Sequence, residues 1–149
     1  MRAVVQRVTR SQVTVDDKVT GRIGPGLMVL IGVEKEDGDK DAEYIAKKIA
    51  GLRVFDDDEG VMNLNITDAG GEVLAVSQFT LLGDVRKGNR PSYFAAAAPE
   101  EADKLYRKVI DLLEARGINV EEGVFRAEMS VDITNDGPVT ILLDSHKLF

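Results

Sequence analysis

Leu27-Met28-Val29-Leu30-Ile31-Gly32-Val33 is a long apolar run within this chain of 149 residues. Such a run is typical of a strand that is buried on both faces of a sheet. The turn-forming tripeptides Asp16-Asp17-Lys18 and Gly24-Pro25-Gly26 precede it. They separate segments rich in β-branched residues, which are 2–9, 12–15 and 19–23. This alternation of strands and turns predicts an antiparallel meander.

Two helices are expected after the meander. The first begins at Asp39, a residue that can cap a helix. Its apolar residues recur at helical spacing on one face: Ala42, Ile45, Ala46, Ile49 and Leu52. The second helix runs from about Pro99 to Arg116, with Pro99 in its first turn and Gly117 as the C-cap. Its apolar stripe consists of Ala102, Leu105, Val109, Leu112 and Leu113.

The other segments are predicted to be strands. Residues 54–55 and 61–62 flank an acidic turn and form a hairpin, and further strands are expected at 72–76, 120, 125–129, 130–134 and 139–143. Helices that interrupt groups of strands, without regular β-α-β alternation, indicate an α+β fold. We therefore expect one domain, residues 1–149, with two main helices packed outside largely antiparallel, barrel-like β-sheets.

Composition excludes several kinds of protein. The chain has no cysteine, which excludes disulfides and thiolate chemistry, and no segment long and apolar enough to be a signal peptide or a membrane span. These features predict a soluble, cytoplasmic protein without membrane contacts. A net charge of −7 argues against a protein that coats nucleic acid non-specifically. The loop Arg86-Lys87-Gly88-Asn89-Arg90 can still bind phosphate locally, or it can be a solvated loop that balances acidic stretches.

Metal and histidine chemistry are not expected. The acidic run 56–60 is too short and too continuous for a calcium-binding loop, so a solvated turn is the better interpretation. The single histidine, His146, lies three residues from the end, where a loosely held tail is a poor place for a catalytic base or a metal ligand. Sequence signatures of zinc proteases, phosphate loops and dinucleotide-binding turns are also missing.

Two segments place polar residues where strands are expected to be apolar. Ser77-Gln78-Phe79-Thr80-Leu81 follows the strand at 72–76, and Asn135-Asp136-Gly137-Pro138-Val139-Thr140 leads into the strand at 139–143. Each segment alone also fits an ordinary strand end or turn. Together they suggest one site.

The two segments resemble the signature motifs of the D-aminoacyl-tRNA deacylase family. The resemblance extends to Met1–Val8, to the turn at 24–26 and to Arg90-Pro91-Ser92-Tyr93-Phe94, and so covers essentially the whole chain. It implies an enzyme without metal or cofactor that hydrolyses the ester of D-aminoacyl-tRNA, and of mischarged glycyl-tRNA. Because their loop lies just after the first of these segments, Arg86, Lys87 and Arg90 are expected to contact tRNA.

The resemblance assigns catalysis to Ser77, Gln78 and Thr80, with Phe79 binding substrate. Because an aminoacyl ester is already activated, a positioned water and backbone N–H groups of residues 77–80 aimed at the oxyanion can suffice. Thr80 then orients the reactants or relays a proton. A nucleophilic Thr80 is the alternative, although no base is evident near it in sequence. The terminal ribose hydroxyl of the substrate is another candidate for the proton relay.

Gly137 and Pro138 are expected to select for chirality. The resemblance implies a homodimer in which a Gly-cisPro element of one subunit enters the site of its partner, where its carbonyl groups exclude L side chains. Arg7 resembles the residue that holds this element, although it can equally be an exposed charge on a strand. Phe125 and Met129 resemble residues of a pocket for the terminal adenosine. Without the resemblance they are interpreted as ordinary core residues.

These expectations leave a rival function open. A non-catalytic tRNA-binding or nucleic-acid-binding module could use the same basic loop, and it would show affinity without turnover. The preferred D-amino acid and tRNA do not follow from the sequence.

Overall fold

The sheet is organised around β1 (Arg2–Val15). In the computed structural model, which describes residues 1–149, β1 pairs antiparallel with β8 (Ser130–Asp144) along most of one side. Its other side pairs with β3 (Gly26–Gly32) through its first half and with β2 (Lys18–Ile23) through its second half. The strand segments were located correctly, although 2–9 and 12–15 form one continuous strand, but the meander was wrong. At 14 residues, β1 is long enough to pair with both β2 and β3, which are not neighbours.

Two parallel strands extend the sheet beyond β3. β6 (Glu72–Ser77) runs parallel to β3, and β7 (Val120–Glu122) runs parallel to β6. The sheet then curls until β7 meets β2. Gly21 and Glu122 lie so close there that a Cβ atom added at Gly21 would overlap the carbonyl oxygen of Glu122. The expected α+β fold with a nearly closed, barrel-like sheet is confirmed, and its parallel half is the part that the sequence pattern did not indicate.

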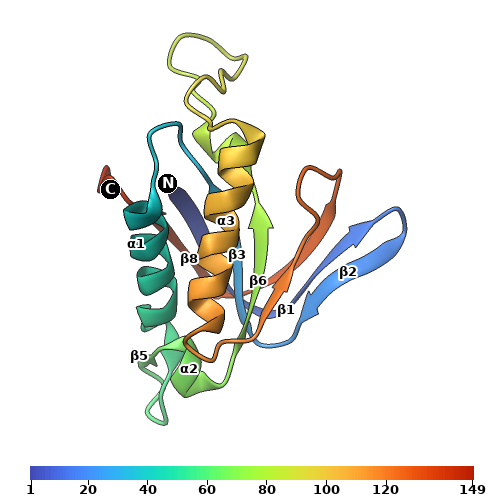
Figure 1. Ribbon diagram of the computed structural model, residues 1–149. Helices are drawn as coiled ribbons and strands as arrows, with labels where there is room; N and C mark the ends of the chain where they lie inside the picture. The colour runs from blue at the N-terminus through green and yellow to red at the C-terminus, as the bar shows by residue number, and fades with distance from the viewer.

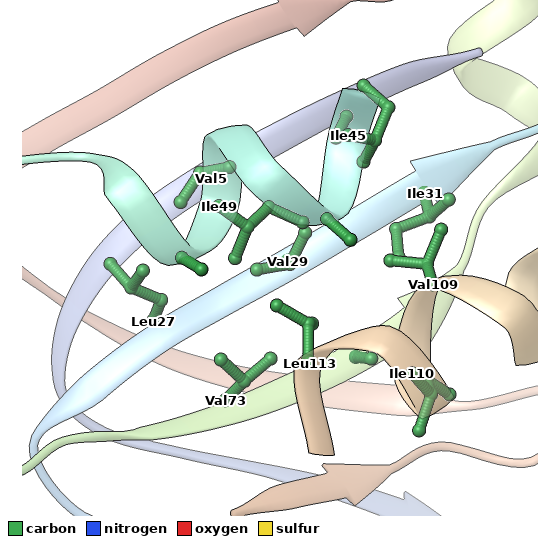
Figure 2. Close-up of a cluster of buried hydrophobic side chains, with 14 of the residues drawn as sticks. Val5, Leu27, Val29, Ile31, Ile45, Ile49, Val73, Val109, Ile110 and Leu113 are labelled. Atoms are coloured by element: carbon green, nitrogen blue, oxygen red, sulfur yellow. The ribbon is translucent and has the colours of Figure 1, made fainter. Parts of the chain in front are cut away.

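Helices α1 (Asp39–Gly51) and α3 (Pro99–Glu114) lie side by side on one face of this sheet (Figure 1). Figure 2 shows Ile45 and Ile49 of α1 and Val109 and Leu113 of α3 directed at the side chains of the strands, including Val29. Both helices were predicted, but Asp39 is not the cap. Gly38 takes that position, and its N–H donates to the Asp41 carboxylate at 2.9 Å.

The apolar run of β3 is buried on both faces, as predicted. Leu27, Val29 and Ile31 belong to the core beneath the helices, whereas Met28 belongs to a second, smaller cluster on the other face of the sheet. Side chains from β1, β2 and β6 complete the second cluster, including Val13, Ile23 and Leu74. The strand therefore contributes side chains to two cores, one on each face of the sheet.

The acidic hairpin forms as expected, from β4 (Phe55–Asp56) and β5 (Met62–Leu64). The carboxylate of Asp57 accepts hydrogen bonds from the N–H groups of Glu59 and Val61. The bond from Val61 is the largest cause of the lowered pKa of Asp57. The carboxylate therefore supports the backbone of the turn. Two short helices, α2 (Ile66–Ala69) and the 3₁₀ helix η1 (Phe79–Leu82), were not predicted because four residues cannot show a periodic stripe.

The C-terminal part differs most from the prediction. Residues 125–129 form a turn rather than a strand, and β8 continues through 135–138 where a chain break in the sheet was expected. The continuity depends on a bulge. Gln6 pairs with Thr140 and Val8 with Asn135, so β8 uses five residue steps where β1 uses two. The second polar motif therefore protrudes from a strand.

Candidate active site

A cavity of about 620 Å³ lies where β6, η1, the start of α3 and the turn before β8 meet. β6 points toward this region and toward the segment that protrudes at the top of Figure 1. The cavity brings together five residues that the sequence singled out, which are Ser77, Gln78, Phe79, Phe125 and Met129. Residues separated by about fifty positions along the chain thus line one space.

The first motif is positioned by the end of β6. Ser77 is the last residue of that strand, and the N–H of Gln78 donates to the carbonyl of Ile31 at 2.7 Å. The chain then turns at once into η1, which begins at Phe79. The expectation that all four amides from 77 to 80 are free is wrong for Gln78. The backbone N–H groups of Phe79 and Thr80, in the first turn of η1, have no hydrogen-bond partner within the helix.

Thr80 contacts no group that can act as a base. Its hydroxyl accepts a hydrogen bond from the side-chain amide of Gln78, and it does not line the cavity. No histidine, lysine or carboxylate forms a hydrogen bond with it. This arrangement is suited to orienting groups and does not generate an alkoxide.

Aromatic rings form two sides of the cavity. Phe79 is 56% exposed and packs edge-on against Tyr93, with ring centroids 5.0 Å apart. Phe125 stacks on Tyr106 at 6.2 Å, and Tyr106 is anchored because its hydroxyl donates to the carbonyl of Ala75 at 3.0 Å. Burial raises the pKa of Tyr106, so this donor stays protonated. A rigid, partly exposed ring at Phe125 can stack on a base.

The core interpretation of Phe125 and Met129 is only partly right. Both are half-buried and pack against the two hydrophobic clusters, but each also lines the cavity. The sulfur of Met129 accepts the N–H of Val124 at 3.3 Å, which closes the turn around Phe125.

The second motif lies in the bulge of β8 and does not line the cavity. Gly137 and Pro138 are exposed, and the peptide bond between them is cis. The side chain of Asn135 spans the bulge, because its oxygen accepts the N–H of Val139 at 3.2 Å and its amide donates to Thr140 at 3.1 Å. The two motifs therefore do not form one site within a single chain, contrary to the simplest expectation.

Arg7 supports the bulge from β1. It is only 9% exposed, so its interpretation as an exposed strand charge is wrong. Its Nε donates to the carbonyl of Asp136 at 3.3 Å, next to Gly137. Its Nη1 donates to the carbonyl of Val54 at 2.7 Å, and carboxylates of Asp56 and Asp136 lie within 3.5 Å of the guanidinium.

The basic loop lies in the protruding segment after η1, but its three cations are not equivalent. Arg86 forms a two-bond ion pair with Asp84, with contacts of 2.7 and 2.9 Å, and this lowers the pKa of Asp84 strongly. Lys87 and Arg90 are exposed and form no ion pair. The charge available to a phosphate backbone therefore comes chiefly from these two residues.

His146 is held more firmly than expected. Its ring nitrogen Nε2 lies 3.0 Å from Asp37, and its backbone N–H donates to Asp144 at 2.7 Å. Glu34, Asp37 and His146 bring potential metal ligands within 4.8 Å of one another. However, the Met1 ammonium pairs with Asp37 at 2.7 Å, so this carboxylate already has a cationic partner.

Sequence reasoning missed much of the cavity wall. The missed residues are Val76, Tyr93, Ala96, Ala97, Pro99, Ala102, Arg126, Ala127 and Val131. Most of them are small or apolar. The four consecutive alanines at 95–98, between the basic loop and α3, were the available signal for a close approach of the chain to a ligand.

Comparisons with known proteins agree on one family. Residues 4–144 match the family model described as D-Tyr-tRNA(Tyr) deacylase. Proteins named D-aminoacyl-tRNA deacylase from Symbiobacterium thermophilum and Anaeromyxobacter dehalogenans are 58% and 59% identical over 149 residues, covering 100% of this chain and 99% and 100% of theirs.

Two solved structures have the same fold. One, titled c-Myc DNA Unwinding Element Binding Protein, is 44% identical with a TM-score of 0.91, over 97% of this chain and 98% of that chain. The other, a probable eukaryotic D-amino acid tRNA deacylase, is 19% identical with a TM-score of 0.81, over 95% of this chain and 97% of its own. None of the helices is both long and apolar enough to span a membrane.

Proposed function

Because the chain belongs to the D-Tyr-tRNA(Tyr) deacylase family, it is a hydrolase of the D-aminoacyl-tRNA deacylase type, and we propose the following account of its reaction. Residues 1–149 act as one catalytic domain that cleaves the ester between a D-amino acid, or mischarged glycine, and the terminal adenosine of tRNA. The cavity carries this proposal, since it combines the polar motif at Ser77 and Gln78 with a stacking ring at Phe125.

In this proposal the enzyme works by positioning and by hydrogen bonding. The backbone N–H groups of Phe79 and Thr80 stabilise the oxyanion that forms when water attacks the ester carbonyl, a contribution of ~3–4 kcal/mol per good donor. Gln78 holds the hydroxyl of Thr80, which orients the water or relays a proton. The terminal ribose of the substrate places a hydroxyl beside the ester, and it can take part in the same relay.

We further propose that chirality is read by Gly137 and Pro138 of a second copy of the chain. Their exposed position outside the cavity supports this assignment, because an element that serves its own pocket would line it. β8 supports a homodimer, since it pairs only with β1 and leaves 15 residues of strand edge unpaired. Backbone carbonyls from the partner would then exclude an L side chain while tolerating many D side chains.

The test is hydrolysis of D-tyrosyl-, L-tyrosyl- and glycyl-tRNA, measured at concentrations where the oligomeric state is known. We expect turnover of the D and glycyl esters and little turnover of the L ester. Ala102→Phe, which fills the cavity from α3, should abolish turnover. Ala115→Phe, at the exposed opposite end of that helix, should not. Equal turnover of D and L esters would refute the chiral filter, and no turnover of any ester would refute the enzyme.

One observation favours a second function. The relative with a TM-score of 0.91 carries a title that describes DNA binding. A module that only binds nucleic acid would bind tRNA or duplex DNA with steep salt dependence and leave aminoacyl esters intact. The net charge of −7 does not favour this alternative.

A further inference from the structure

We infer that the guanidinium of Arg126 binds the phosphate group on the 5′ side of the terminal nucleotide. This inference rests on the proposed function and assigns the anionic part of the same substrate. It follows from the chemistry of the cavity wall, from the unpaired state of Arg126 and from its backbone conformation.

Arg126 is the only charged residue among the 14 that line the cavity. The others are apolar or neutral, so they can accommodate a side chain, a base and a ribose but cannot neutralise a phosphate. A terminal nucleotide brings one phosphodiester with it. An arginine fork can bind phosphate oxygens through two parallel hydrogen bonds.

The guanidinium of Arg126 has no partner within the chain. It forms no ion pair and no hydrogen bond, although the chain carries seven more acidic than basic residues. Some arginines of this protein are paired, such as Arg86 with Asp84 and Arg107 with Glu122, and the unpaired Arg90 and Arg116 lie outside the cavity. A free guanidinium at the edge of an otherwise neutral cavity is suited to an external anion.

The backbone conformation at Arg126 is one that an arginine rarely adopts. Residues 124–127 form a turn in which the N–H of Ala127 donates to the carbonyl of Val124 at 3.2 Å. Arg126 is the third residue of this turn and has φ of +65°, where turns favour glycine or asparagine. A large side chain at this position is a cost to the fold, and ligand binding would account for it.

The order of residues also matches the order of groups in the substrate. Ser77 and Gln78 line the end of the cavity assigned to the ester, and Phe125 supplies the ring assigned to the adenine. Arg126 follows Phe125 directly. A base stacked on that ring would therefore place its ribose and 5′-phosphate near the guanidinium, and the rest of the tRNA would leave the cavity past it.

The test compares three D-tyrosyl esters that differ in their phosphate: the ester of adenosine, the ester of adenosine 5′-monophosphate, and D-tyrosyl-tRNA. Kinetics and unfolding midpoints are measured for wild type, Arg126→Gln and Arg126→Gly. Arg116→Gln serves as the matched control, because Arg116 is an exposed arginine beyond the far end of α3 that forms no ion pair.

We expect Arg126→Gln to lower kcat/KM for both phosphate-bearing esters about tenfold or more, chiefly through KM. The loss on the adenosine ester should be several-fold smaller. Arg126→Gly should show the same pattern with an unfolding midpoint equal to or above that of wild type, because glycine suits the turn. Arg116→Gln should show neither effect.

Three results would overturn the inference. They are an equal loss on all three esters, no loss on the monophosphate ester, or a change in oligomeric state that accounts for the loss. If wild type cleaves none of the esters, the proposed function fails and this inference fails with it. If wild type cleaves all three esters but Arg126→Gln shows no selective loss on the phosphate-bearing ones, the proposed function stands and the inference about Arg126 fails.

Discussion

Replacing Arg7 with methionine tests whether β1 holds the bulge that carries Gly137 and Pro138. Methionine is unbranched and adapts to gaps in a core, but it lacks the charge and all hydrogen-bond donors. The substitution removes the bond to the Val54 carbonyl at 2.7 Å and the bond to the Asp136 carbonyl at 3.3 Å. Because the side chain is buried, water cannot replace these bonds easily.

The cost can be worked out from the individual contacts. The short bond to Val54 is charge-assisted, and losing it costs ~1.5–3 kcal/mol. Asp56 and Asp136 are 54% and 47% exposed, so their ion pairs with Arg7 add only about 0.5 kcal/mol each. The sum is roughly 2.5–4 kcal/mol, which for a chain of this length lowers the melting temperature by roughly 5–15 °C.

The assay combines thermal unfolding with hydrolysis of D- and L-tyrosyl-tRNA. Arg7→Met should lower the melting temperature as calculated and reduce the preference for the D ester, because the bulge loses its tether. Arg10→Met is the control on the same strand, since Arg10 is exposed and makes only one long bond, to Thr134 at 3.3 Å. An unchanged melting temperature would refute the energetic reasoning. A large drop with an unchanged D-to-L ratio would show that Arg7 supports only the fold.

Four further predictions follow from the site. Thr80→Ala should keep a substantial fraction of turnover because no base contacts that hydroxyl, and a trapped aminoacyl adduct on Thr80 would contradict this. Chelators should leave activity unchanged, and His146→Ala should affect stability more than turnover; activity lost to a chelator and restored by a metal would show otherwise. Charge reversal at Lys87 and Arg90 should weaken tRNA binding and reduce the salt slope by about two, with little effect at saturating substrate, as measured by titrations at several salt concentrations. Gly137→Ala should lower both the melting temperature and turnover, because φ there is +117° and an added Cβ would lie 2.9 Å from two neighbouring side chains; wild-type values for both would disprove it.

Local chemistry made part of this molecule predictable. The helices, the acidic hairpin and the doubly buried β3 follow from short-range periodicity and turn residues, which the sequence displays directly. The polar segment at Ser77–Thr80 stood out for the same reason, since polar groups at the end of an apolar strand are visible without a structure.

Contacts between distant segments were not predictable in this way. Nothing in the run from Arg2 to Val15 indicates that β1 pairs with β2 and β3 in succession. The segment 125–129 looked like a strand because apolar residues alternate there with charged ones. Arg126 was overlooked because its importance depends on a cavity built from four separate segments. His146 was judged by its position near the chain end, whereas Asp37 and Asp144 hold it in place.

The bulge in β8 has one more consequence, which concerns parity. From Gln6 to Arg10, β1 advances four residue steps, while the paired segment of β8 from Thr140 to Thr134 advances six. An odd difference would send every side chain beyond the bulge to the opposite face of the sheet, but a difference of two restores the original alternation. The odd-numbered residues of β8 therefore face inward on both sides of the bulge: Val139 and Ile141 pack against the core beneath the helices, and Val131 packs against the second cluster. The bulge that carries Gly137 and Pro138 can therefore change its contacts without changing which residues of β8 face inward.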